Sequence, residues 1–515
     1  MISHLTQGFS AIASLTILGT ILGGSLIGIL GGAIPGLSAA GTIAIVTPLT
    51  FGMSPLISLA LLAAIYTGAQ YGGSITATLL NTPGAPESAV MVLDGHTMTK
   101  QGRAGEALWA AIIAGVIGGL ISTIILVAAA TPLAKEALNF GPAEYFTLVL
   151  FGLSVLASLS EGSILKGIIV TVAGLAITVI GLDPITGQSR YTFGVPQLLD
   201  GVPVVPVLIG LFATSEGLVL LRSLAGTPER PPGTVRLFGS FPRGRAMRKI
   251  IRFGLLGTAI GTVIGIKPGG GATIASLVAY SVAKQVSSNP EEFGKGAVEG
   301  LITPEAADKA TVGAALIPLL VLGLPASAST AVLIGAFTIH GVVPGPLLFR
   351  DSGPLVYGIM ASLFVANLCV MLLGIAGMRP LTRVGGLPPR RLGVIILVTT
   401  FVGSYIAVRD ISGVWFALVF GIIGYGLKRY HFPVAPMVLA LVLGPLLESN
   451  LRRALIIANG DPTTFVTRPI SAVLVGLTVI AFGLPPLLRL FRGRRVRHRG
   501  AVDAPATKEQ EHSGT

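Results

Sequence analysis

Apolar stretches separated by short polar segments run along almost the whole chain, at 11–34, 42–66, 108–130, 145–158, 164–182, 203–221, 251–266, 272–283, 311–340, 355–377, 393–408, 412–427, 432–447 and 470–488. Many approach the roughly 20 apolar residues that a helix needs to cross a hydrocarbon core of about 30 Å. A transmembrane barrel would instead show short segments of alternating polarity. The pattern predicts an all-α polytopic membrane protein with about 11–13 transmembrane segments, because some stretches are expected to be half-helices.

Two ladders of glycines spaced four residues apart occur in this pattern. The first comprises Gly24, Gly28, Gly32 and Gly36, and the second comprises Gly257, Gly261, Gly265 and Gly269. Pro35 or Pro268 precedes the last glycine, and the offset between the ladders is 233 residues at every position. Glycine at every fourth position lets another helix pack closely, and the Pro-Gly step ends or kinks the helix. The chain therefore contains one structural unit twice.

A second pair of interruptions follows the ladders. One centres on Asn81-Thr82-Pro83-Gly84 and the other on Gly323-Leu324-Pro325-Ala326, with the two prolines 242 residues apart. Proline lacks an N–H and disfavours helix in the preceding residue, so each stretch is expected to split into two half-helices with a polar tip. Duplicated broken helices are typical of secondary transporters built from inverted repeats. We therefore expect two inverted repeats with broken helices and re-entrant hairpins.

Unwound backbone inside a membrane is tolerated only where it is buried or lines a cavity, so these four interruptions form the candidate binding site. Free N–H groups at half-helix N-termini attract anions, whereas carbonyl and hydroxyl oxygens suit small cations. The candidate substrate-binding residues are Gly36, Ser38, Asn81, Thr82, Pro83, Gly84, Lys267, Gly269, Gly270, Pro325, Ser327 and Ser329. The candidate ion-coupling residues are Ser74, Asn81, Thr330 and Glu87.

Few ionisable residues lie near these interruptions. Lys267, directly before Pro268, either meets a carboxylate of the substrate or extends to the membrane interface. Glu87 titrates with a coupled proton, caps a helix or lies at the surface. Because few buried acids are available, sodium held by neutral oxygens is favoured over a proton relay. No cofactor or bound metal is expected beyond a coupling sodium ion.

Composition supports the membrane assignment. Of the 515 residues, 52% are hydrophobic and 11% are charged, with a mean hydropathy of +0.83, whereas a soluble domain carries about 25% charged residues. The net charge of +13 does not indicate nucleic-acid binding, because the first 99 residues contain no Lys or Arg and the basic residues cluster beside apolar spans. The single cysteine, Cys369, excludes an intrachain disulfide.

The distribution of charge also divides the chain. We expect a first transmembrane repeat at 1–221, a basic cytoplasmic linker at 222–250, a second repeat at 251–490, and a basic, then polar and disordered tail at 491–515. Basic segments beside apolar spans mark the cytoplasmic side. Counting spans back from a cytoplasmic C-terminus places the basic loops around Lys428 and Arg390 on that same side, which supports the orientation.

No motif points to an enzyme. The chain lacks a G-x-x-x-x-G-K-[ST] loop, an H-E-x-x-H pair and a G-x-S-x-G elbow, and its six histidines are scattered. A channel would show a repeated pore filter in a small symmetric subunit, and an intramembrane enzyme would need facing reactive side chains within its spans. A carboxylate channel and a non-transporting membrane scaffold remain the alternatives to a secondary transporter.

A set of short strings, in order along roughly residues 15–490, resembles the TctA family. They are Tyr66-Thr67-Gly68-Ala69-Gln70-Tyr71-Gly72-Gly73-Ser74, Asn81-Thr82-Pro83-Gly84, 94–105, Phe293-Gly294-Lys295-Gly296, Pro304-Glu305-Ala306-Ala307, Leu322-Gly323-Leu324-Pro325, 340–346, 443–448 and 468–471. Each string alone is weak, and together they are highly specific. TctA proteins are the large membrane subunit of tripartite tricarboxylate transporters.

The resemblance implies an ion-coupled secondary importer of carboxylates such as citrate, driven by sodium or protons, in a bacterial inner membrane. It also implies a small four-helix membrane subunit and a periplasmic solute-binding protein as partners. The chain departs from the family pattern where Asp308 and Lys309 replace a common pair of asparagines. Ala326 replaces a common glycine, and Lys267 replaces a neutral residue. These departures bear on the ligands rather than on the class of protein.

Overall fold

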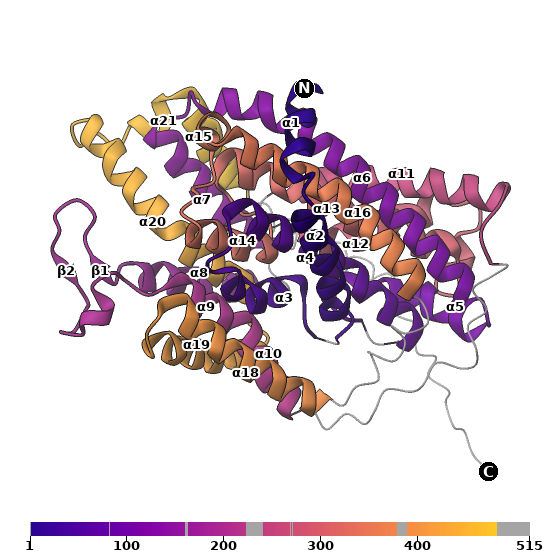
Figure 1. Cartoon of the computed structure of the whole chain (residues 1–515). Helices are drawn as coiled ribbons and strands as arrows, with labels where there is room; N and C mark the ends of the chain where they lie inside the picture. The colour runs from indigo at the N-terminus through magenta and orange to yellow at the C-terminus, as the bar shows by residue number, and fades with distance from the viewer. Residues whose placement is uncertain are drawn as a thin grey trace, which may run out of the picture.

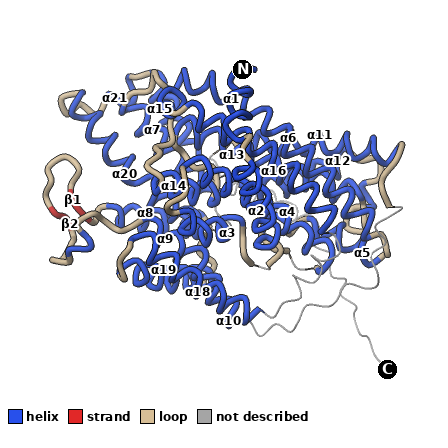
Figure 2. The backbone as a smooth tube through the Cα atoms, in the orientation of Figure 1, coloured by secondary structure: helices blue, strands red, loops and turns tan. Residues whose placement is uncertain are grey.

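The structure is a computed structural model that describes residues 2–34, 36–81, 83–159, 163–222, 240–267, 269, 271–377 and 389–481. Thr82, Gly270, Pro35 and Pro268 lie outside the described residues, as do most of the expected linker and the whole of the expected tail. The described chain is almost entirely helical, with one two-stranded antiparallel hairpin that projects from the side of the bundle (Figure 2).

The elements of the first half follow from the N-terminus. The helices are α1 (Ile2–Ile12), α2 (Leu15–Gly32), α3 (Ala39–Val46), η1 (Thr47–Thr50), α4 (Pro55–Leu80), η2 (Pro86–Ser88), η3 (Val92–His96), α5 (Thr97–Lys100), α6 (Ala104–Ala137), α7 (Pro142–Leu159), α8 (Ile164–Thr178), η4 (Pro196–Leu198), α9 (Val204–Leu208), η5 (Ile209–Thr214) and α10 (Ser215–Arg222). The hairpin consists of β1 (Gly181–Leu182) and β2 (Ser189–Arg190), with Gly181 opposite Arg190.

The second half repeats much of this order. Its helices are α11 (Arg245–Gly265), α12 (Gly271–Val286), η6 (Pro290–Glu292), α13 (Val298–Leu322), α14 (Ala328–Ile339), α15 (Pro346–Asp351), α16 (Gly353–Gly377), α18 (Pro389–Val408), α19 (Ser412–Arg429), α20 (Val434–Ile457) and α21 (Thr464–Thr467).

The helices form two packed groups. In one group α2, α4, α6, α11, α12, α13 and α16 lie against one another, and in the other α7, α8, η5, α10, α18, α19 and α20 do so (Figure 1). The short helices α3 and α14 contact both groups. They are also the helices that follow the first ladder and the second tip, so the interruptions lie where the two groups meet.

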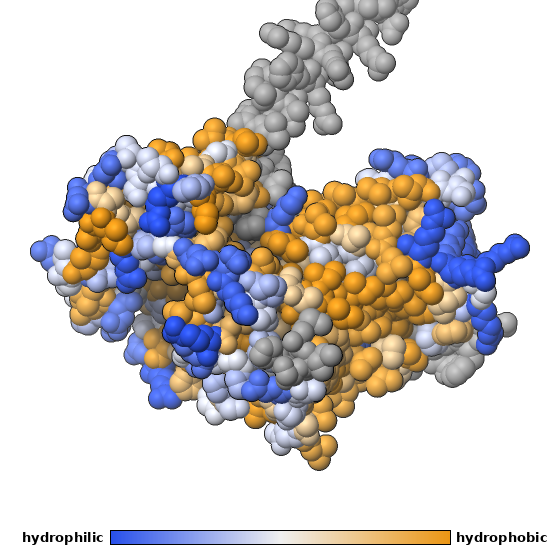
Figure 3. All heavy atoms as spheres, turned by 90° about the horizontal axis from the view of Figure 1, so that it is seen from above, coloured by the Kyte–Doolittle hydropathy of each residue, from blue (hydrophilic) through white to orange (hydrophobic). Residues whose placement is uncertain are grey.

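The surface is that of a membrane protein. Figure 3 shows a broad apolar area over one face, with hydrophilic residues gathered toward its edges. Among the described residues, seven helices are long and apolar enough to cross a membrane, and five further apolar helices are shorter. The all-α polytopic fold expected from the sequence is confirmed. The number of crossings stays a prediction, because a helix of 12 residues such as α14 spans only about 18 Å.

Two sequence-based boundaries were wrong. The expected span 42–66 is divided, because α3 ends at Val46 and α4 begins only at Pro55. The expected span 311–340 begins too late, because α13 starts at Val298 and continues through four charged residues, Glu299, Glu305, Asp308 and Lys309. Hydropathy hid this part of the helix, because an average over the sequence counts these four side chains as polar although all of them are buried.

The duplication holds in three dimensions. A Cβ at Gly28 would collide with the carbonyl oxygen of Ile65 on α4, and a Cβ at Gly261 would collide with that of Ala307 on α13. The two glycines are 233 residues apart, and the residues whose carbonyls they face, Ile65 and Ala307, are 242 residues apart. These are the two offsets found in the sequence. The ladders therefore pack α2 on α4 and α11 on α13 in the same register. The inversion of one repeat relative to the other stays a prediction.

Candidate functional site

Each ladder ends against the tip of its own repeat. We call Gly36 and Gly269 the first and second break, and 81–84 and 323–326 the first and second tip. The N–H of Gly36 donates to the carbonyl of Gly84 at 2.9 Å, and the N–H of Gly269 donates to that of Ala326 at 3.0 Å. Both glycines have a positive φ, which an L side chain adopts only with strain. Break and tip therefore form one hydrogen-bonded unit in each repeat.

The helices leading into the tips also end alike. α4 stops at Asn81 with φ 56°, and α13 stops at Gly323 with φ 70°, both left-handed. Each stop lies two residues before the tip proline, as expected from the restriction that proline places on the preceding residue. Asn81 occupies this conformation without the freedom of glycine, and its side chain is exposed. The predicted broken helices are thus confirmed, although no ligand role for Asn81 has been tested.

Several predicted hydroxyl ligands already cap helices. Ser38 Oγ accepts from the N–H of Gly41 at the start of α3. Ser327 Oγ accepts from the N–H of Thr330, and Thr330 Oγ1 accepts from the N–H of Ser327, which forms a capping box on α14. Ser329, which lies between these two residues in the sequence, is buried. These hydroxyls satisfy helix N-termini and retain acceptor capacity toward a ligand.

The two repeats meet around the tips. α14 packs on α3, and η2, just beyond the first tip, packs on α12. The hydroxyls of Tyr66 and Ser327 lie 3.4 Å apart and link the middle of α4 to the second tip. Tyr66 is also within electrostatic range of Glu87, which is half-buried in η2, and of Asp308 on α13. The structure therefore brings the second tip, η2 and the centres of both long helices into one region.

The remaining predicted residues lie at the edge of this region. Lys267 is exposed beside the second break, Pro83 is half-buried and Pro325 is buried. Gly36 lies directly against the carboxylate of Glu216 on α10, which pairs with Lys428 at 2.6 Å. The sequence did not suggest this partly buried ion pair beside the first break.

A second group of polar residues lies inside the bundle, and the sequence analysis missed most of it. Glu305, Asp308 and Lys309 occupy one face of α13, and none of them is more than 3% exposed. Lys309 Nζ lies 2.8 Å from Glu305 Oε1 and 2.9 Å from Asp308 Oδ2. It also donates to the carbonyl of Gln70 at 3.0 Å and to Ser74 Oγ at 3.1 Å. We call Glu305, Asp308 and Lys309 the buried triad.

The Lys309 ammonium has three N–H donors but four oxygen atoms close to it. Its three N–H groups are taken by Gln70, Ser74 and Asp308, so the contact with Glu305 is an ion pair without hydrogen-bond geometry. Among the described residues, Oε2 of Glu305 and Oδ1 of Asp308 consequently have no hydrogen-bond partner, and Oε1 of Glu305 has only the ion-pair contact with the ammonium. Buried carboxylate oxygens without partners are costly, because desolvation removes the hydrogen bonds that water would supply.

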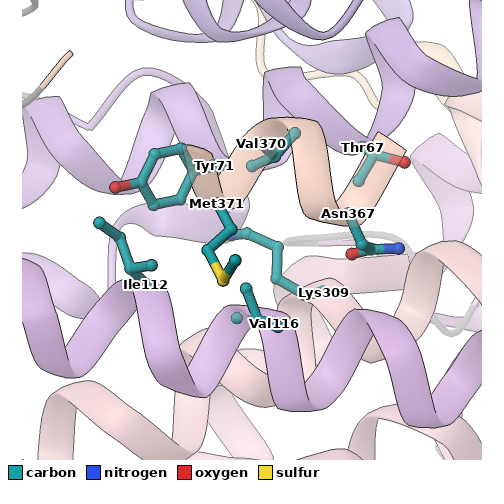
Figure 4. A pocket seen from close by; sticks show the side chains of 9 residues that line it. Thr67, Tyr71, Ile112, Val116, Lys309, Asn367, Val370 and Met371 are labelled. Atoms are coloured by element: carbon teal, nitrogen blue, oxygen red, sulfur yellow. The ribbon is translucent and has the colours of Figure 1, made fainter. Parts of the chain in front are cut away.

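A narrow pocket, part of it open to the outside, reaches Lys309 of the buried triad. Figure 4 shows Tyr71, Asn367, Val370 and Met371 around the Lys309 side chain. Thr67 of α4 and Ile112, Gly115 and Val116 of α6 complete the lining. Lys309 is the only charged residue in this lining. Ser74, which was predicted as an ion ligand, is not part of the lining and accepts a hydrogen bond from Lys309.

These contacts overturn one premise drawn from the sequence. Sodium was favoured because few buried acids seemed available, yet Glu305 and Asp308 are both fully buried in a central helix. The signal was present as charges at i, i+3 and i+4 between the second ladder and the second tip, a spacing that puts them on one helical face. Because α13 reads as apolar only after residue 310, they looked like part of a loop.

A buried carboxylate also joins the two repeats outside the candidate site. Asp94 Oδ1, in η3, accepts from the N–H groups of Gly294, Gly296 and Ala297 at 2.8–2.9 Å. Tyr280 donates its hydroxyl to the other oxygen at 2.9 Å. The two motifs around Asp94 and Gly294 thus fold against each other, and Asp94 anchors the start of α13.

A more exposed ion cluster provides a contrast to the buried triad. Asp183, beside β1, accepts from the N–H groups of Ile185 and Thr186 and pairs with Arg452 at 2.8 Å. Those backbone N–H groups, and then Arg452, hold the pKa of Asp183 well below its usual value of 3.8. Arg190 and Glu448 complete the cluster, 2.6 Å apart.

Comparison with known proteins agrees with this architecture. The profile of the Tripartite tricarboxylate transporter TctA family matches residues 18–439. An "Uncharacterized 52.8 kDa protein in TAR-I ttuC' 3'region" of Agrobacterium vitis is 40% identical over 497 residues, covering 96% of this chain and 98% of its own. An "Uncharacterized protein in TAR-II ttuC' 3'region" of the same organism is 41% identical over 235 residues, covering 46% and 97%. No solved structure matches.

Proposed function

Because the chain belongs to the tripartite tricarboxylate transporter TctA family, we propose that it is the large subunit of an ion-coupled importer that carries carboxylates of the citrate type. It works in a bacterial inner membrane with a periplasmic solute-binding protein and a small membrane subunit. The C-terminus and the basic linker face the cytoplasm, in keeping with the preference of Lys and Arg for that side.

One observation carries the proposal. A membrane-embedded bundle contains two break–tip units, each closed by one hydrogen bond, from Gly36 to Gly84 and from Gly269 to Ala326. Secondary transporters bind their substrates at such paired interruptions of helices. A carboxylate of the substrate would accept hydrogen bonds from backbone N–H groups beside the breaks and from Ser327 and Ser329, with Lys267 as a nearby cation. Asn81, Glu87 and Thr330 remain proposed contributors to coupling.

Uptake by the reconstituted transporter tests this proposal. Proteoliposomes holding this chain and its small subunit, with the solute-binding protein outside, are expected to accumulate radiolabelled citrate above its external concentration when an inward proton or sodium gradient is imposed. Collapse of the gradient by an ionophore should stop accumulation. Citrate that only equilibrates across the membrane would favour a channel, and absence of any uptake would favour a non-transporting scaffold.

The residues at the tips are tested in the same preparation. The double variant Asn81→Ala with Pro325→Ala is expected to reduce uptake at least tenfold, because it changes both tips. Its matched control is Asn459→Ala, another exposed asparagine with a positive φ that lies at the end of α20. Unchanged uptake in the tip variant would contradict the assignment of the site.

A further inference from the structure

The buried triad carries one negative charge more than its surroundings balance. Glu305 and Asp308 contribute two carboxylates and Lys309 one ammonium, and all three are buried. The groups facing the triad from α4 are the phenols of Tyr66 and Tyr71, which lie within electrostatic range of Asp308 and Glu305 respectively. Neither phenol supplies a positive charge.

The other neighbouring helices do not supply one either. α16 contributes the neutral amide of Asn367, and α6 and α11 approach with glycines such as Gly118 and Gly261. α12 contributes the hydroxyl of Ser276, which donates to the carbonyl of Pro304. The charged side chains of α6, α11 and α12 lie toward the ends of those helices. A buried unpaired charge is expensive, so a cation must join the triad.

The place that a metal cation would take is already filled. Sodium would seek the oxygens of Gln70, Ser74, Asp308 and Glu305, and the Lys309 ammonium contacts all four at 2.8–3.1 Å. A proton needs no such cage, because it adds to a single carboxylate oxygen. Oε2 of Glu305 and Oδ1 of Asp308 have no hydrogen-bond partner among the described residues and can receive it.

The same contacts argue against a carboxylate substrate at this place. Lys309 lines the pocket, but its charge is already offset by two carboxylates within 3 Å. An anion entering there would meet a cluster with no positive charge to spare, and a net negative one when the carboxylates hold no proton. The pocket is better suited to water, which could carry a proton to the triad.

We infer that the buried triad holds one exchangeable proton, shared between Glu305 and Asp308, and that this proton is the ion coupled to transport. The inference rests on the proposed function and names its coupling ion. A proton adds to one carboxylate oxygen in one state of the transporter and leaves from it in another, and no other bond changes. The Lys309 ammonium stays charged throughout.

The position of the triad explains how binding or release of the proton affects the tips. Lys309 on α13 donates to the carbonyl of Gln70 and the hydroxyl of Ser74 on α4, so it ties together the two helices that end at the tips. Ser74 lies two helical turns before Asn81. Gain or loss of the shared proton changes how strongly the carboxylates hold Lys309, and therefore the balance between its contacts with α13 and α4.

Infrared spectroscopy of the full chain in lipid bilayers tests for the proton without any substrate. At pH 7 the wild type is expected to show the C=O band of a protonated carboxyl. Glu305→Gln and Asp308→Asn should each abolish it, because either leaves a neutral carboxylate–ammonium pair that needs no proton. Glu291→Gln, which changes an exposed glutamate of η6, is the matched control and should keep the band.

Two results would overturn the inference. One is a wild-type spectrum with no protonated band at pH 7 and carboxylate bands that shift when sodium replaces potassium, which would assign the triad to sodium. The other is a protonated band that persists in both Glu305→Gln and Asp308→Asn, which would place the proton on another acid.

Transport separates failure of this inference from failure of the proposed function. In proteoliposomes both variants should exchange labelled for unlabelled citrate at near wild-type rates, while accumulation driven by a proton gradient falls at least tenfold. Proton-driven accumulation that survives in both variants contradicts the inference and leaves the proposed function standing. A wild type that shows the band but transports no citrate contradicts the proposed function and leaves the buried proton in place.

Discussion

The two long helices α4 and α13 are built on the same plan and differ at their centres. Both receive a glycine ladder, both end in a left-handed residue, and both lead into a tip that bonds to a break. Positions 242 residues apart nevertheless pair Ala63 with Glu305, Tyr66 with Asp308 and Thr67 with Lys309. One helix is neutral at its centre, and the other carries the buried triad.

The difference shows which constraints the duplication imposes. Most ladder glycines face a backbone carbonyl of the neighbouring helix, so no side chain fits there and both repeats have the glycine. The positions that hold the triad face Gln70, Ser74 and the pocket lining, where side chains can change if their charges are balanced. Packing therefore requires the same glycines in both repeats, whereas the centres of the two long helices can carry different side chains.

Removing the positive charge of the triad, which only α13 carries, should cause the largest loss of stability. Lys309→Gln leaves the two buried acids with the shared proton as their only counter-charge, and breaking a buried ion pair in this way costs about 3–5 kcal/mol. The melting temperature of the purified chain in detergent should fall markedly at pH 7. The double variant Lys309→Gln with Asp308→Asn removes one negative charge and should recover part of the loss. An unchanged melting temperature in the single variant would mean that the triad is already neutral without Lys309.

Substitution of the ladder glycines should cause the next largest loss of stability, and the loss should be equal in the two repeats. Gly28→Ala and Gly261→Ala each place a Cβ against a backbone carbonyl, and overpacking of this kind costs about 1–3 kcal/mol. Gly23→Ala is the matched control, because no atom lies within 4 Å of the added Cβ and the substitution favours helix. Unfolding in denaturant measures all three. A large loss in one repeat with none in the other would show that the two ladders pack differently.

The partly exposed cluster around Asp183 should give the smallest change in stability and a distinct dependence on pH. The folded pKa of Asp183 lies below its unfolded value, so its contribution is present above the unfolded pKa and is lost as the pH falls through the folded pKa. Asp183→Asn should therefore lower the melting temperature slightly at pH 7, and the gap from the wild type should close in acid. High salt should also narrow the gap, because exposed ion pairs are screened. A gap independent of pH and salt would contradict this assignment.

Much of the fold was readable from the sequence because it depends on local chemistry. Glycines at every fourth residue permit close helix packing wherever they occur, and the prolines at 83 and 325 bar helix in the residue before them. The two offsets, 233 and 242, reappear in the contacts of Gly28 with Ile65 and of Gly261 with Ala307. The predicted hydroxyls of Ser327 and Thr330 lie at the tips, although the structure also uses them as helix caps.

The candidate site was only partly readable, because burial of charge depends on partners far along the chain. Glu305, Asp308 and Lys309 resemble a hydrated surface when hydropathy is averaged over a window, and the oxygens that hold Lys309 from α4 lie more than 230 residues away. The link between Tyr66 and Ser327 spans 261 residues in the same way.

The sequence by itself determined the membrane class, the duplication and the places where helices break, since each follows from hydropathy or from the backbone restrictions of glycine and proline. The tertiary structure alone decided which polar residues share an environment. Only when the neighbouring helices pack on α13 does Lys309 lose water and gain two oxygens of α4 beside the carboxylates of its own helix, and only then do those carboxylates become a buried pair that needs a proton. Electrostatic energy depends on distance and desolvation in space, and neither is a property of the order of residues.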